Sequence, residues 1–137
     1  MKFVEETIPK TTRDLCDRIS VAMMEIPEGN FARSPISGEP YRDFDGAFYG
    51  LERGVLNLRK KLGDDRVDQI LEMLAQAKAH YEVGEAKLGG ALMEDTKMVV
   101  IGRRPWAYPM ELYRWRVDPS LPELSEADIL HKGDQGD

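Results

Sequence analysis

The sequence predicts a mostly helical protein with a minor β contribution, and three observations support this fold class. Long segments repeat apolar residues every three or four positions, which is the period of an amphipathic helix. Gly63 and Asp64 stand between two such segments and indicate a tight connection between helices. Two short runs near the C-terminus alternate or are rich in β-branched residues, which is typical of strands. We therefore expect a helix, a long loop, an antiparallel helical hairpin and a small C-terminal two-stranded β element.

The first helix is predicted to begin at Thr11 or Thr12, because a threonine hydroxyl can accept a hydrogen bond from the first turn. Its apolar face is formed by residues spaced four, four and three apart, namely Leu15, Ile19, Met23 and Ile26. Pro27 ends the helix, since proline disfavours a helical residue before it. From Pro27 to Asp45, glycine and proline are too frequent for a regular element. The aromatic residues in this loop predict that it packs on the helices.

The central hairpin is predicted from the two apolar periods on either side of the glycine connection. The earlier period runs from Phe48 to Leu62, and Asp43 or Asp45 can cap its start. The later period begins at Asp64 and keeps one register as far as Leu92.

Glycines interrupt the later half of this third predicted helix. Gly84, Gly89 and Gly90 would each cost about 1 kcal/mol relative to alanine in a helix interior. The third helix therefore either breaks near Gly84 or uses its glycines to let another backbone approach closely.

The expected β element joins Met98–Ile101 to Tyr113–Val117 through a connection longer than a tight hairpin. We expect residues 1–118 to form a single globular domain. The remaining residues, 119–137, read as an acidic and partly disordered tail.

Composition excludes several classes of protein. The net charge of −6 argues against binding nucleic acid or a membrane surface through the protein as a whole. The single cysteine, Cys16, rules out an internal disulfide. No apolar run approaches the roughly 18 residues that span a bilayer, and the first residues lack the pattern of a signal peptide. We expect a cytoplasmic protein that does not contact membranes.

No motif in the sequence predicts catalysis, a cofactor or a metal. Cys16 neighbours the apolar face of the first helix, which favours a buried structural thiol over a nucleophile. His80 follows Glu72 and Gln76 along one helical row, but too few further ligands are available for a metal site. The serines and glycines match no nucleophile elbow or phosphate loop. We therefore expect a protein that is not an enzyme.

One segment opposes the acidic character of the chain. Residues 97–117 hold five basic residues and one acidic residue, for a net charge of +4. The candidate binding residues are Arg103, Arg104, Trp106, Tyr108, Arg114 and Arg116. Arginine and aromatic residues are enriched at interface hot spots and can also stack on bases. The structural alternative is that the aromatic residues close the core while the arginines face water or pair with the acidic tail.

These observations predict a non-enzymatic protein-protein interaction module, an adaptor or regulatory subunit that can also self-associate. The alternative is a binder of nucleic acid or a phosphate ligand through residues 103–116. A second alternative is an enzyme whose site the sequence does not reveal. Salt-dependent binding of nucleic acid would favour the first alternative, because phosphate contacts release counterions.

Overall fold

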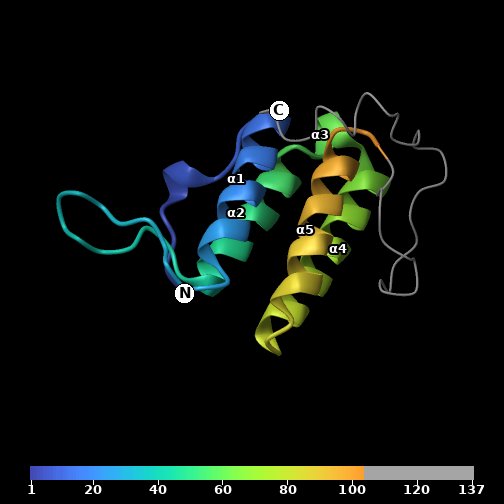
Figure 1. The fold of residues 1–137 in the computed structure, drawn as a ribbon. Coiled ribbons are helices and arrows are strands. Elements are labelled where there is room, and N and C mark those ends of the chain that lie inside the picture. The colour runs from blue at the N-terminus through green and yellow to red at the C-terminus, as the bar shows by residue number, and fades with distance from the viewer. Residues whose placement is uncertain (104–137) are drawn as a thin grey trace, which may run out of the picture.

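A computed structural model describes residues 1–103, and Figure 1 shows an array of helices that alternate in direction. The long helices are α1 (Thr12–Glu25), α2 (Phe44–Asn57), α4 (Asp64–Glu82) and α5 (Ala86–Val100). Two short elements are a 3-10 helix, η1 (Glu5–Thr7), and the single turn α3 (Arg59–Leu62). The mostly helical fold class is confirmed for these residues.

The four long helices form an up-down bundle closed into a ring. Helix α1 packs on α2 and α5, and α4 packs on the same two helices. In Figure 1, α1 and α4 run in one direction while α2 and α5 run in the other. Antiparallel neighbours joined by short connections are the expected topology of such a bundle. The most extensive contact is between α4 and α5.

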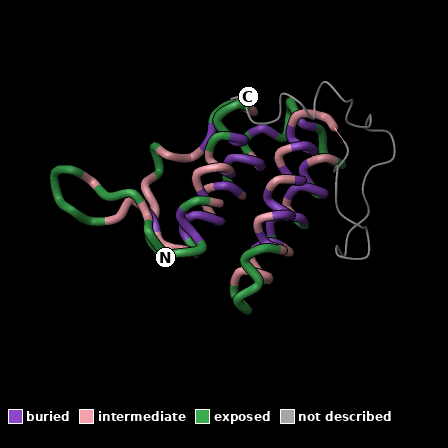
Figure 2. Tube along the Cα trace, in the orientation of Figure 1, coloured by how far each residue is buried: buried purple, intermediate pink, exposed green. Residues whose placement is uncertain are grey.

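The core lies along the axis of the bundle, where the apolar stripes of all four long helices meet. Figure 2 shows the buried residues on the inward faces of the helices and the exposed residues on the outside. The largest side chains that are fully buried come from every long helix: Leu15, Ile19, Phe48, Ile70, Met73, Leu74, Leu92 and Met93. Burial of an aliphatic or aromatic side chain of this size contributes about 1.5 to 3 kcal/mol.

The starts of α1 and α2 follow the predicted caps, whereas α4 begins at Asp64 without a side-chain cap. The Thr11 hydroxyl accepts a hydrogen bond from the Asp14 backbone N–H at 3.0 Å and caps α1. The Asp43 carboxylate accepts one from the Gly46 N–H at 2.7 Å and caps α2, so the first of the two predicted caps is used. Each bond satisfies a backbone donor that has no partner inside the helix.

The predicted third helix is two helices. Gly84 adopts φ +82°, which residues with a side chain rarely adopt, and the chain turns there between α4 and α5. The break near Gly84 is therefore the correct alternative. The second predicted helix is also shorter than expected, because α2 ends at Asn57 and a separate turn, α3, carries the chain to Leu62. Helix α2 nevertheless packs on α4 as predicted.

The strand predicted over Met98–Ile101 is wrong, because Met98, Val99 and Val100 form the last turn of α5. These three side chains are buried in continuation of the apolar face that Leu92 begins. Tertiary burial on a helical period outweighs the weak strand preference of β-branched residues. Among residues 1–103 the structure contains no strand, only an isolated antiparallel bridge in the loop. The second predicted strand, the boundary at residue 118 and the acidic tail lie outside the described residues.

The loop between α1 and α2 packs on the helices only at its ends. Phe31 and Phe44 lie partly buried against the core. The middle of the loop projects away from the bundle (Figure 1) and is pinned by a bridge between Arg33 and Pro40. Ile36, at 96% exposure, contacts almost nothing. The prediction that this loop packs on the helices is therefore correct for its ends and wrong for its tip.

The N-terminal arm lies across the start of α2. The backbone N–H of Asp43 donates to the Lys2 carbonyl at 2.9 Å, and the Lys2 N–H donates to the Asp43 carboxylate at 3.0 Å. None of the helices in residues 1–103 is long and apolar enough to cross a membrane.

Candidate functional site

An open groove of about 620 Å³ lies at one end of the bundle. Helices α1 and α4 begin at this end, and α3 and α5 finish there (Figure 1). The groove is lined by four basic residues together with one threonine and three aliphatic residues: Arg13, Lys61, Arg66, Arg103, Thr12, Leu62, Val100 and Ile101. Its volume is within the usual range of ligand pockets.

Helix termini place the basic side chains of the groove. Arg13 is exposed in the first turn of α1, and Lys61 is exposed in α3. Arg66, half-buried near the start of α4, donates through Nη1 to the Val100 carbonyl at 3.1 Å. This bond satisfies a carbonyl at the negative end of α5 and ties α4 to α5.

Arg103 reaches the groove through the turn that ends α5. Its backbone N–H donates to the Met98 carbonyl at 2.8 Å, and the Gly102 N–H donates to the Val99 carbonyl at 3.0 Å. With Gly102 at φ +82°, these bonds form a Schellman motif. The motif fixes the direction in which the chain leaves α5, and so it places Arg103 at the groove.

The lining that residues 1–103 contribute to the groove is basic, with four cationic side chains and no carboxylate among these residues. Asp64, the acidic residue nearest in sequence to Lys61, pairs at 2.9 Å with Arg59, which does not line the groove. Arginine and lysine can bind carboxylate or phosphate oxygens with charge-assisted hydrogen bonds. Leu62 and Val100 are buried beneath these charges, and Ile101 beside them is partly exposed. The groove therefore suits an anionic ligand that can also contact Ile101.

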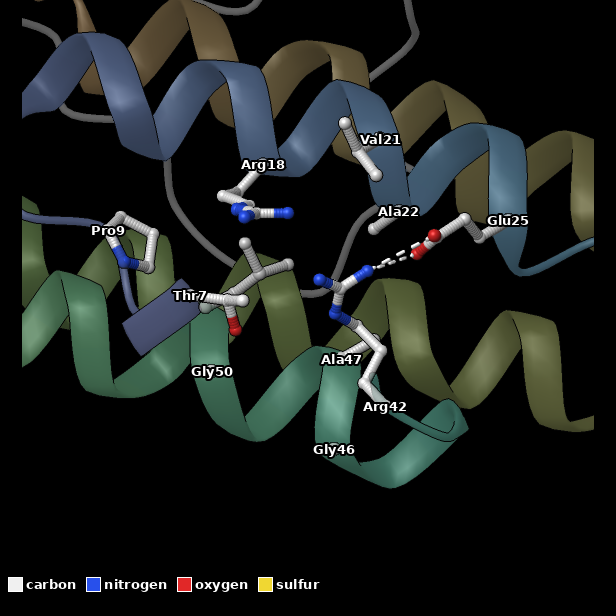
Figure 3. Close-up of a pocket in the computed structure, with 11 residues that line it drawn as sticks. Thr7, Pro9, Arg18, Val21, Ala22, Glu25, Arg42, Gly46, Ala47 and Gly50 are labelled. Carbon is white, nitrogen blue, oxygen red and sulfur yellow. Dashed lines mark hydrogen bonds and ion pairs between the residues drawn. The ribbon is translucent and has the colours of Figure 1, made fainter. Parts of the chain in front are cut away.

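A second, smaller pocket of about 20 Å³ lies between α1 and α2 (Figure 3). Glu25 and Arg42 form a buried ion pair beside it, with Arg42 Nη1 at 2.8 Å from one carboxylate oxygen and 3.1 Å from the other. The Ala32 backbone N–H donates to the same carboxylate at 2.9 Å. These bonds hold the C-terminal end of α1 to both ends of the long loop.

Arg18 approaches the same pocket from α1 (Figure 3). Partial burial lowers the pKa of its guanidinium, and the positive charge of Arg42 lowers that pKa further, against weaker attraction from Glu25 and Asp14. Both causes disfavour the charged form. Two guanidinium groups thus share a pocket beside a single carboxylate.

Of the six candidate residues chosen from the sequence, only Arg103 lies in the described part of the chain, and it lines the groove. Arg104, Trp106, Tyr108, Arg114 and Arg116 lie outside it. Sequence reasoning missed Arg13, Lys61 and Arg66, because they belong to different helices and share no local pattern. Their one common signal is a position near a helix end.

The residues considered for chemistry take other places. Cys16 is buried in the core at 6% exposure, as predicted. His80 Nδ1 lies 2.9 Å from the Glu85 carboxylate across the turn between α4 and α5. Within residues 1–103, no group of three or more side chains that could hold a metal ion comes together.

Comparison with known proteins gives no relative for this chain. It matches no protein-family model, no curated protein and no solved structure to a significant degree.

Proposed function

We propose that this protein is a non-enzymatic interaction module of the cytoplasm, an adaptor or regulatory subunit that binds an acidic segment of a partner protein in the basic groove. One observation carries the proposal: four basic residues from separate elements, Arg13, Lys61, Arg66 and Arg103, line one groove of about 620 Å³ in a chain of net charge −6. Such local charge attracts an anionic partner and orients its approach.

The apolar part of the groove favours a protein segment over a polyanion. Ile101, which is partly exposed above the buried Leu62 and Val100, offers contact area to the side chains that would accompany acidic residues in a peptide. A long nucleic acid would extend past the groove over a protein that is acidic overall. A second copy of this chain is one partner of the required charge.

A second candidate is binding of nucleic acid or a phosphate ligand. It is favoured by the position of Arg103, which lines the groove and begins the segment 103–116 with its aromatic and basic residues. The same experiment separates the two candidates.

The test is titration of a labelled peptide of alternating glutamate and leucine, followed by fluorescence anisotropy. Lys61→Glu should weaken binding about tenfold or more, because a charge-assisted contact contributes about 1.5 to 3 kcal/mol. The matched control is Lys87→Glu, which makes the same charge change on an exposed residue in the first turn of α5, at the other end of the bundle.

Equal weakening by the two variants would contradict the groove as the binding site. Binding of a single-stranded oligonucleotide that falls steeply with salt and is lost in Lys61→Glu would replace the proposal with the second candidate. Sedimentation of the wild type and of Lys61→Glu over a range of concentrations tests self-association through the same groove.

A further inference from the structure

The pocket between α1 and α2 holds an imbalance of charge. Figure 3 shows the guanidinium groups of Arg18 and Arg42 facing the same gap, with the Glu25 carboxylate to one side of Arg42. Both carboxylate oxygens lie within hydrogen-bond distance of Arg42 Nη1, and one of them also accepts from Ala32 N–H. Glu25 therefore neutralises Arg42 and has little remaining capacity for Arg18.

Arg18 is left without an ion pair of its own, although Glu25 and Asp14 attract its charge through space. Its guanidinium forms no hydrogen bond or ion pair with any residue in the range 1–103. Bulk water hydrates a fully exposed guanidinium, but the Arg18 side chain is partly buried between two helices, so its hydration is incomplete. A charge in such surroundings is stabilised by a counterion much more than one on the open surface.

The pocket also limits the size of such a counterion. Its volume is about 20 Å³, which is room for one water-sized particle. Small residues of α2, namely Gly46, Ala47 and Gly50, form one wall, and Val21 and Ala22 of α1 form another. A tetrahedral oxyanion such as sulfate or phosphate has several atoms of this size and would have to protrude from the pocket.

We propose that this pocket binds a single halide-sized anion, chloride in a cell, between the guanidinium groups of Arg18 and Arg42. The anion accepts hydrogen bonds from both arginines and links α1 to the end of the long loop beside α2. The site is separate from the basic groove, and it neither requires nor tests the partner proposed there.

The location of the site is tested by bromide in a crystal of the full chain, since bromide replaces chloride and scatters anomalously. The expected result is an anomalous peak between the side chains of Arg18 and Arg42. A bromide-soaked crystal without that peak would overturn the proposal, and so would a peak confined to other surface arginines.

The affinity is tested in solution by chloride-35 line broadening. Arg18→Met removes one of the two cationic ligands and should weaken chloride binding about tenfold or more, as expected for the loss of one charge-assisted hydrogen bond. The matched control is Arg53→Met, an exposed arginine of α2 that does not line the pocket, which should leave the broadening unchanged. Equal broadening in wild type and Arg18→Met would overturn the proposal.

Thermal unfolding supplies a readout that does not depend on the exchange rate of the ion. Sulfate raises the Tm of most proteins because it is excluded from their surface, so the readout is the difference between wild type and Arg18→Met in each salt. At constant ionic strength, replacing sulfate by chloride should change the Tm of the wild type more favourably than that of Arg18→Met, because a ligand that binds only the folded state stabilises it. The same change of Tm in the two proteins would refute the site.

Discussion

Glu25 and Arg42 show how one buried pair of residues can hold a loop to a bundle. The two side chains are each only 8% exposed, and the pair joins residues 17 positions apart. Taking two charges out of water costs several kcal/mol per ion, and their attraction offsets this cost only while both are present. The position of the loop against the bundle therefore depends on both residues.

Removing one residue of this pair should destabilise the protein more than replacing both residues by apolar ones. Arg42→Met leaves the Glu25 carboxylate buried without its counterion and should lower the free energy of unfolding by about 3 to 5 kcal/mol. The double variant Glu25→Leu with Arg42→Met should recover much of that loss, because neither charge of the pair remains without its partner. Urea unfolding of the wild type, the two single variants and the double variant measures the coupling. Additive losses in the double variant would mean that the two charges act independently.

The Asp43 carboxylate is a second residue whose charge matters for stability. Desolvation alone would raise its pKa, but hydrogen bonds from the Lys2 and Gly46 N–H groups and the nearby N-terminal amine lower the pKa overall. A carboxylate with a lowered pKa in the folded state stabilises the protein above its unfolded pKa of about 3.9. That contribution is lost as the pH falls through the folded pKa.

Asp43→Ala should therefore lower the free energy of unfolding by about 1 kcal/mol at pH 7, the usual contribution of such a cap. The difference from the wild type should shrink as the pH falls below about 4, because protonation weakens the wild-type cap. Urea unfolding at several pH values measures it. Asp68→Asn, which alters an exposed carboxylate within α4, is the control, and a pH-independent loss in Asp43→Ala would contradict the electrostatic explanation.

At the scale of the elements, the turn at Gly84 separates α4 from α5, where the sequence pattern would also allow one continuous helix. Gly84 has φ +82° in this turn, whereas Gly90 lies inside α5, where an added Cβ would approach only the Tyr81 hydroxyl at 3.7 Å. Gly84→Ala should destabilise the protein by about 1 to 2 kcal/mol, the cost of a left-handed backbone for a residue with Cβ. Gly90→Ala should stabilise it by a few tenths to about 1 kcal/mol. Thermal unfolding measures both effects, and the Tm should shift in opposite directions in the two variants. If both variants were stabilised, the turn would not need glycine.

The helices could be predicted from the sequence to the extent that their signals are local. Thr11 and Asp43 cap the helices they were expected to cap, and the glycine at 84 marks a true break. The end of α5 could not be predicted, because Val99 and Val100 are β-branched and only burial against the other helices makes them helical. Local preference and tertiary packing disagreed there, and packing decided the structure.

At the scale of the whole molecule, the basic groove is a product of topology. Lys61 and Arg66 flank the short connection between α3 and α4, whereas Arg13 comes from the start of α1, about 50 residues earlier, and the up-down arrangement brings these ends to the same place. No short window of sequence contains all of these residues. Arg103 alone could be chosen in advance, because it belongs to a continuous basic segment.

The cluster of four basic residues at one end of the bundle also has a kinetic consequence. The field of a local concentration of positive charge attracts an approaching anion and orients the two molecules before they touch. Added salt shortens the reach of that field to about 8 Å at physiological ionic strength, and so it slows association while leaving the contacts that govern dissociation nearly unchanged. An anionic partner of the proposed kind would therefore associate quickly in dilute salt and dissociate at a rate that depends little on salt.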